Sequence, residues 1–204
     1  MIKTLLLGLV LAAIPALGHD GAGSIQLYID FHQIPPDAVV NSVRNELARI
    51  MSPMGLVFNW SLLAENRGNG LSARLAVVRF KGQCDAANLT ALNSRSGVLG
   101  WTYMTDGVIQ PFTDIDCDSI RAFLGGDLAT GPKEDHERTY GRAVGRVLAH
   151  ELYHIFVKTA RHSSRGVAKP YYSVQELLSR DFQFEQKECD ELRRYWSDLV
   201  TTGF

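Results

Sequence analysis

The chain has 204 residues, with 21 basic and 22 acidic side chains and 46% hydrophobic residues. A formal net charge of -1 gives no overall field that would attract a polyanion, and no basic tract concentrates positive charge locally. The composition therefore argues against a nucleic-acid-binding protein and fits a globular chain with a substantial core.

The N-terminus has the pattern of a secretory signal. Lys3 precedes an apolar run over residues 5–17, which ends in small residues. We therefore expect a signal peptide over residues 1–18 and a single domain over residues 19–204. The run is shorter than the roughly 20 residues that span a bilayer, and an uncleaved anchor is the alternative. The sequence thus predicts an exported protein, secreted or periplasmic, that is monomeric and has no stable membrane association after signal cleavage.

The first part of this domain predicts a strand, a helix and two further strands. Residues 24–31 alternate between apolar and polar side chains, as a half-buried strand does, and residues 37–51 place apolar side chains at helical spacing. Residues 56–62 and 75–80 are short β-rich runs, and residues 65–70 form a polar, glycine-containing loop between them. This order predicts an α+β fold.

A β-hairpin and a loop are expected next. Residues 98–105 and 108–112 flank the dipeptide Asp106-Gly107, which suits a two-residue hairpin turn because both positions tolerate positive φ. The segment Gly125 to Glu137 is rich in glycine and charged residues and predicts a loop over one rim of a cleft.

A long helix is expected over residues 138–159, followed by C-terminal helices within the amphipathic region 173–200. Gly141, Gly145 and Ala149 form a stripe of small residues on the long helix. Because each interior glycine costs about 1 kcal/mol in a helix, we interpret the stripe as close packing of this helix against the sheet. The alternative is simply a weak start to the helix.

The most informative motif is His150-Glu151-Leu152-Tyr153-His154, which lies inside this helix. Residues four apart share one helix face, so both imidazoles can reach a single ion while Glu151 projects beside it. Catalytic zinc has three protein ligands and an activated water, for which Glu151 would be the general base. The motif arises by chance roughly once in a hundred chains of this length, and random matches seldom have such apolar flanks.

The segment from Val147 to Phe156 resembles the active-site helix of the zincin metallopeptidases, whose motif has uncharged, mostly hydrophobic flanks. The resemblance implies a zincin-like α+β fold, with a mixed β-sheet packed on the active-site helix and C-terminal helices. It also implies a Zn2+ cofactor and peptide-bond hydrolysis. In zincins an edge strand before the active-site helix pairs with the substrate, and residues 99–102 are the candidate strand. An ordinary hairpin is the alternative.

His162 is the first candidate for the third zinc ligand. In the metzincin branch of the zincins the third histidine follows the second by six residues, with a glycine between them. Here Ala160 and Val157 occupy those two positions, and no methionine follows His154 to supply a Met-turn. A continuing helix would carry His162 about 12 Å beyond His154 along its axis, so the chain must turn back for the two to share an ion.

Glu176 is the alternative ligand, because its spacing from His154 resembles that of the gluzincins. The asparagine that usually precedes that glutamate is missing, and Glu176 could equally be a first-turn residue beside a helix cap at Ser173. His136 is interpreted as a solvated residue near the start of the helix. The predicted metal set is therefore His150, His154 and His162.

The three cysteines Cys84, Cys117 and Cys189 lack the spacing of a zinc ribbon. In an exported protein, Cys84 and Cys117 could form a disulfide that leaves Cys189 unpaired, and three buried thiols are the alternative.

The leading hypothesis is a secreted zinc metallopeptidase acting on a peptide or protein substrate, with Glu151 as the catalytic residue. One alternative is a zinc amidase or hydrolase acting on a non-protein amide, and another is a zinc-binding protein without catalysis. Tyr171 or Tyr172 could stabilise an oxyanion or simply pack against the core. The segment Gly125 to Glu137 is the first candidate for a latency element.

Overall fold

The computed structural model describes residues 24–66, 74–87, 97–130, 132 and 135–201. The predicted signal peptide and most of the expected loop over residues 65–70 lie outside these ranges. The described strands form a five-stranded mixed sheet in the order β2-β1-β3-β5-β4. Their bounds are β1 (Ser24–Phe31), β2 (Val57–Leu62), β3 (Leu75–Lys81), β4 (Gly100–Thr105) and β5 (Val108–Asp116).

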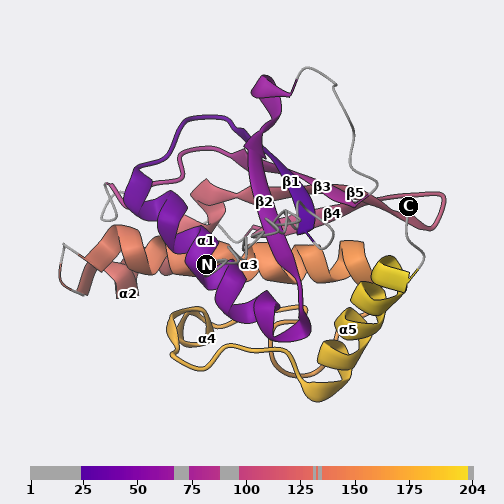
Figure 1. Ribbon diagram of the computed structural model, residues 1–204. Helices are drawn as coiled ribbons and strands as arrows, with labels where there is room; N and C mark the ends of the chain where they lie inside the picture. The colour runs from indigo at the N-terminus through magenta and orange to yellow at the C-terminus, as the bar shows by residue number, and fades with distance from the viewer. Residues whose placement is uncertain (1–23, 67–73, 88–96, 131, 133–134, 202–204) are drawn as a thin grey trace, which may run out of the picture.

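The described α-helices are α1 (Asp37–Met51), α2 (Cys117–Thr130), α3 (His136–Val157), α4 (Val174–Leu178) and α5 (Gln186–Thr201). Figure 1 shows α1 and α3 beside each other under the sheet, with α4 and α5 below α3 in this view. The arrangement is a zincin-like α+β fold, in which a mixed sheet packs on the helix that carries the histidine motif. None of the described helices is long and apolar enough to cross a membrane.

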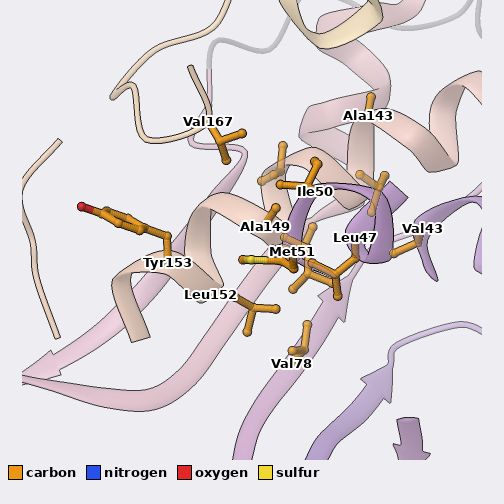
Figure 2. Close-up of a cluster of buried hydrophobic side chains, with 14 of the residues drawn as sticks. Val43, Leu47, Ile50, Met51, Val78, Ala143, Ala149, Leu152, Tyr153 and Val167 are labelled. Atoms are coloured by element: carbon orange, nitrogen blue, oxygen red, sulfur yellow. The ribbon is translucent and has the colours of Figure 1, made fainter. Parts of the chain in front are cut away.

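The core lies between the sheet and the pair α1 and α3. Leu47 and Met51 of α1, Val78 of β3 and Ala149 and Leu152 of α3 are all buried, and Figure 2 shows them together in one cluster. The helical spacing that predicted residues 37–51 thus reflects the apolar face of α1, and the predicted bounds of this helix are confirmed.

The predicted hairpin is confirmed, although its strands begin and end differently. β4 starts at Gly100, and β5 continues to Asp116 because Thr113, Asp114 and Ile115 are buried in the sheet. Asp106 and Gly107 have φ values of 51° and 78°, as the tight turn requires. β5 pairs in parallel with β3, whereas β4 is antiparallel to β5 and forms the edge of the described sheet.

The prediction that the glycine stripe of α3 lies against the sheet is wrong, because the stripe packs against α1. A Cβ at Gly141 would lie 2.7 Å from the carbonyl oxygen of Val39, and one at Gly145 would lie 2.9 Å from that of Val43. These distances leave no room for a methyl group. The glycines therefore allow the backbones of α1 and α3 to approach closely.

The prediction of a loop over Gly125 to Glu137 is also wrong for most of that segment. α2 continues to Thr130, and α3 begins at His136. Leu124 and Leu128 are buried on α2, and this packing offsets the low helix propensity of Gly125 and its neighbour. No described residue of the segment lines the cavity over the histidines, so the described part of the segment does not support its role as a latency element.

A disulfide joins Cys84, just after β3, to Cys117, the first residue of α2, and Cys189 is free. The pairing left open by the sequence is thus resolved. The bond fixes the start of α2 beside the sheet.

Candidate metal centre and active site

α3 places His150 and His154 on one face, one helical turn apart. Both side chains are buried, with 7% and 6% of their surface exposed. Their Nε2 atoms lie 3.0 Å from each other. The buried apolar residues on the other faces of α3 hold this helix, and therefore both rings, in a fixed position.

Two main-chain carbonyl groups set the tautomer of these rings. The Nδ1 atom of His150 lies 2.7 Å from the oxygen of Val167, and that of His154 lies 2.7 Å from the oxygen of Thr159. A carbonyl oxygen can only accept, so each Nδ1 carries the hydrogen and donates it. Both Nε2 atoms therefore present lone pairs to each other.

The chain turns back directly after α3. Lys158 ends the helix in the left-handed conformation, with φ 54° and ψ 43°, and its N–H donates to the carbonyl of His154. The side-chain oxygen of Thr159 accepts from the N–H of Arg161, and the N–H of Ser163 donates to the carbonyl of Ala168. These local bonds shape the return that the position of His162 requires.

The return brings His162 to the two helical histidines. Each of His150, His154 and His162 offers one ring nitrogen as a potential ligand atom, and these three atoms lie within 4.8 Å of one another. The ring of His162 stacks on His150 at a centroid distance of 5.2 Å and meets the edge of His154 at 4.8 Å. Unlike the other two, His162 is exposed. It thus completes the group from the solvent side.

The competing residues lie elsewhere. Glu176 forms a capping box with Ser173 at the start of α4, and its carboxylate pairs with Lys169. The Lys169 ammonium lowers the pKa of the Glu176 carboxyl. His136 is the first residue of α3 and, like Glu176, is outside the group of ligand atoms found among the described residues. The geometry therefore joins His162, and not Glu176, to the helical pair.

Glu151 points from α3 toward the edge strand β4. The Thr102 hydroxyl donates to its Oε2 at 2.8 Å and also lies 3.1 Å from its carbonyl oxygen. A Cβ at Gly100 would lie 3.1 Å from Oε1 of Glu151 and 2.9 Å from Val147, so only glycine permits this approach without a shift. Burial raises the pKa of Glu151 to about 7, against the opposing effect of the Thr102 hydrogen bond.

The pKa values of the histidines shift in the direction that metal binding needs. Burial, together with the proximity of His154, lowers the pKa of His150 to about 3. Burial also lowers the pKa of His154 and of His162. All three imidazoles are therefore neutral near neutral pH, and a metal does not have to displace a proton from them.

Tyr172 lies behind His150. Its hydroxyl donates to the carbonyl of Val167 and lies 2.8 Å from Nδ1 of His150. The side chain is partly buried and also contacts Phe182. Tyr171, by contrast, is 83% exposed and lines the cavity beside the histidines. Tyr172 therefore holds His150 and Val167 in place, whereas Tyr171 is free to meet a ligand.

A cavity of about 740 Å³ lies over the three histidines and Glu151. Residues of β4 line it, as do Ala160 and Pro170 of the segment after α3. Its size is within the range of small-molecule and cofactor sites. The candidate residues thus line one accessible space.

Sequence reasoning missed the contributions of four residues to this site. Val167 and Thr159 contribute main-chain carbonyl oxygens, which the residue type in the sequence does not reveal. Lys158 takes the left-handed position that usually selects glycine or asparagine. Thr102 lies within the candidate substrate strand, but only the structure shows that it contacts Glu151.

The fold is zincin-like, and on it the three histidines and Glu151 form a candidate metal site. A solved structure with this fold is archaemetzincin from Methanopyrus kandleri, which is 14% identical, with a TM-score of 0.52. The match covers 89% of this chain and 99% of that chain. At this identity the likeness shows the fold alone. No protein-family model matches the chain, and no curated protein matches its sequence.

Proposed function

We propose that the protein is a zinc-dependent metallopeptidase. His150, His154 and His162 would hold Zn2+, and Glu151 would be the general base in peptide-bond hydrolysis. Export through the N-terminal signal, action outside the cytoplasm without stable membrane association, a monomeric state and the absence of nucleic-acid partners belong to the same proposal. They rest on the sequence.

The observation that carries the proposal is the contact between the two Nε2 atoms. Both atoms are unprotonated acceptors 3.0 Å apart in a buried environment, where two lone pairs repel each other. A cation between them turns this repulsion into ligation. Ligand atoms about 2.0 Å from a tetrahedral zinc ion lie roughly 3.3 Å apart, close to the observed separation.

The donor set also fits zinc. Imidazole nitrogens are common zinc ligands, and the ligand histidines of such sites usually donate their second N–H to a carbonyl or carboxylate. His150 and His154 both do so. Among the described residues the group contains three ligand residues, as in catalytic sites, and not the four of closed structural sites. This count favours catalysis over zinc binding without turnover.

Zinc, when bound, supplies a Lewis acid that makes water a nucleophile near neutral pH. Glu151 is placed to take the proton, because it lines the cavity together with the three histidines and the Thr102 hydroxyl holds its Oε2. A base works best when its pKa is near the operating pH, and burial brings the pKa of Glu151 to about 7. The carboxylate can then pass the proton to the leaving amine.

A peptide substrate is favoured over an isolated amide by the position of β4. This strand is the edge of the described sheet and lines the cavity through Gly100, Trp101 and Thr102. The outer main-chain groups of an edge strand can pair with an extended peptide. Such pairing would lay a peptide bond across the face of Glu151.

Replacement of Glu151 by glutamine tests this function. We expect Glu151→Gln to bind one zinc ion like the wild type and to lower kcat by about 10²- to 10⁴-fold, the usual contribution of a general base. Zinc is measured by elemental analysis and hydrolysis with a mixture of quenched fluorescent peptides. Glu65→Gln, on an exposed glutamate, is the matched control. Unchanged hydrolysis in Glu151→Gln would remove Glu151 from the mechanism, and a wild type without zinc would remove the enzyme.

A further inference from the structure

The cavity wall beside the histidine cluster is apolar. It includes Val98, Leu99, Met104, Ile109, Phe123 and Val147. These side chains come from four parts of the chain, namely the residues before β4, the β4–β5 hairpin, α2 and α3. A wall of this kind stabilises a bound group mainly by removing apolar surface from water.

Charged groups are scarce in this space. Among the described residues that line the cavity, the ionisable ones are the three histidines, Glu151, Tyr171 and Tyr172, with no lysine, arginine or aspartate. The histidines are assigned to the metal, and Glu151 is assigned to proton transfer. No described lining group therefore remains to pair with a charged side chain, a free α-amino group or a free α-carboxylate. An unpaired charge is costly to desolvate.

The apolar lining extends to both sides of the point where β4 meets Glu151. Val98 precedes Gly100 by two residues and is 66% exposed, and Met104 follows Thr102 by two residues and is 56% exposed. Apolar side chains left in water at the rim of a cavity mark a binding surface. A chain that runs along β4 would meet such contacts before and after the bond opposite Glu151.

We propose that the site cleaves within uncharged, apolar stretches of a peptide chain and does not trim residues from a free end. This inference rests on the proposed function, because it assigns the substrate class of the same site. The uncharged walls select apolar side chains around the bond, and the contacts on both sides of Glu151 require substrate on both sides.

The first test uses blocked peptides of one length on the zinc-loaded protein. Acetylated and amidated octapeptides carry leucine or phenylalanine on both sides of the central bond, and matched peptides carry lysine or aspartate there. We expect kcat/KM to be about 10- to 100-fold higher for the apolar peptides, since pocket contacts of this kind discriminate by such factors. Peptides of the same sequence with free ends should be cleaved at the same internal bond.

A binding measurement gives a second readout. The Glu151→Gln variant, loaded with zinc, should bind the blocked apolar peptide more tightly than its lysine or aspartate match in calorimetric titrations. Equal affinity for all three peptides would overturn the inference, as would cleavage that needs a free amino or carboxyl end. Cleavage of no peptide by a zinc-loaded wild type is a different outcome, since it would overturn the proposed function as well.

Charge substitutions at the rim give the sharpest comparison. We expect Met104→Lys to raise kcat/KM for the aspartate peptide relative to the lysine peptide, and Met104→Glu to do the reverse. Val57→Lys is the matched control, because Val57 is also 56% exposed but lies on β2, away from the cavity. It should leave the preference unchanged. If both Met104 variants keep the wild-type preference, the rim does not contact substrate and the inference fails.

Discussion

The two halves of the candidate metal centre are built in different ways. His150, Glu151 and His154 lie on α3, where buried apolar residues on the remaining faces fix the backbone. His162 lies on the segment after Lys158, is exposed, and is positioned by local hydrogen bonds such as the one from Ser163 to Ala168. A rigid half would thus supply two of the proposed ligands and the proposed base, and a turn would add the proposed third ligand from the solvent side.

The largest expected effect concerns the third ligand. Removal of a residue that only hydrogen-bonds to a metal ligand lowers metal affinity by roughly 10- to 100-fold. His162→Ala should lower zinc affinity by more than this, because it deletes a proposed ligand atom. Glu176→Ala should keep zinc and lose about 1 kcal/mol of stability with its capping box. Competition with a chromophoric chelator measures the affinity, and urea unfolding measures the stability.

Loss of zinc in Glu176→Ala but not in His162→Ala would contradict this assignment. His162 would then lie beside the metal without binding it, and Glu176 would be the third ligand, as in the gluzincin-like alternative. His154→Ala is the positive control, since it removes a ligand from the rigid half.

The second prediction concerns the support beneath the rigid half. Arg146 lies one turn before His150 and is 1% exposed. Its Nε donates to Glu46 of α1 at 2.6 Å, and its other nitrogens donate to the carbonyls of Glu176, Leu177 and Ser179. Glu46→Gln removes one charge of this buried pair and should destabilise the fold by about 3–5 kcal/mol.

The same pair should make stability depend on pH. Burial alone raises the pKa of Glu46, but hydrogen bonds from Arg49 and Arg146 outweigh it and lower the pKa below its usual value of 4.5. A carboxyl with a lowered pKa contributes stability above the pKa of the unfolded state and loses it as pH falls through the folded value. Urea unfolding between pH 7 and 3 should therefore show a smaller loss on acidification for Glu46→Gln than for wild type.

An exposed pair provides the control for this result. Asp190 and Arg193 on α5 are three residues apart, as Glu46 and Arg49 are, and both are about half exposed. Asp190→Asn should change the free energy of unfolding by less than about 0.5 kcal/mol. If Glu46→Gln were as mild as this control, the buried network would not support α3.

The third prediction contrasts two helical glycines. Gly145→Ala places a methyl group 2.9 Å from the Val43 carbonyl and should destabilise the fold by about 1–3 kcal/mol. Gly126→Ala on α2 meets no atom within 4 Å and should stabilise it by about 1 kcal/mol through helix propensity. Opposite signs in thermal unfolding would confirm that contact with α1 determines the effect. Equal signs would contradict it.

The helical half of the site and the segment after α3 also differ in how far they could be predicted from the sequence. The i, i+4 spacing of His150 and His154 and the apolar period of residues 37–51 report directly on helix faces, so the helical pair of histidines and the apolar face of α1 were predictable. The stripe of Gly141 and Gly145 predicted a close approach but could not name the partner, because one sequence does not say which backbone lies opposite. The helix through Gly125 was missed because tertiary packing of Leu124 and Leu128 outweighed local propensity.

For the segment between α3 and His162, the sequence predicted only that the chain must turn back, and not the path that it takes. His162 had to come back to His154, and Thr159 and Ser163 were compatible with a turn, but side-chain chemistry did not select its path. The tautomers of the helical histidines depend on the main-chain oxygens of Val167 and Thr159. Their positions follow from the turn itself, and no residue type encodes them.

The smallest expected change in the free energy of unfolding tests at which residue α3 ends. The metzincin motif has glycine at the position of Val157, yet here Lys158 adopts the left-handed conformation, with φ 54°. A side chain in this region costs about 1 kcal/mol that glycine avoids, so Lys158→Gly should stabilise the metal-free fold by roughly 0.5–1 kcal/mol. Val157→Gly should instead destabilise it by about 1 kcal/mol or more, because Val157 is helical and packs against the core.

Urea unfolding of both variants in the presence of a chelator separates this backbone effect from zinc binding. The expected result is opposite signs for two adjacent glycines, which would show that this chain ends its active-site helix one residue later than the metzincin pattern does. That extra residue is part of why the third histidine follows eight residues after His154 and not six. If Val157→Gly were the stabilising change, the helix would end at the metzincin position, and the longer spacing to His162 would have to be absorbed within the turn.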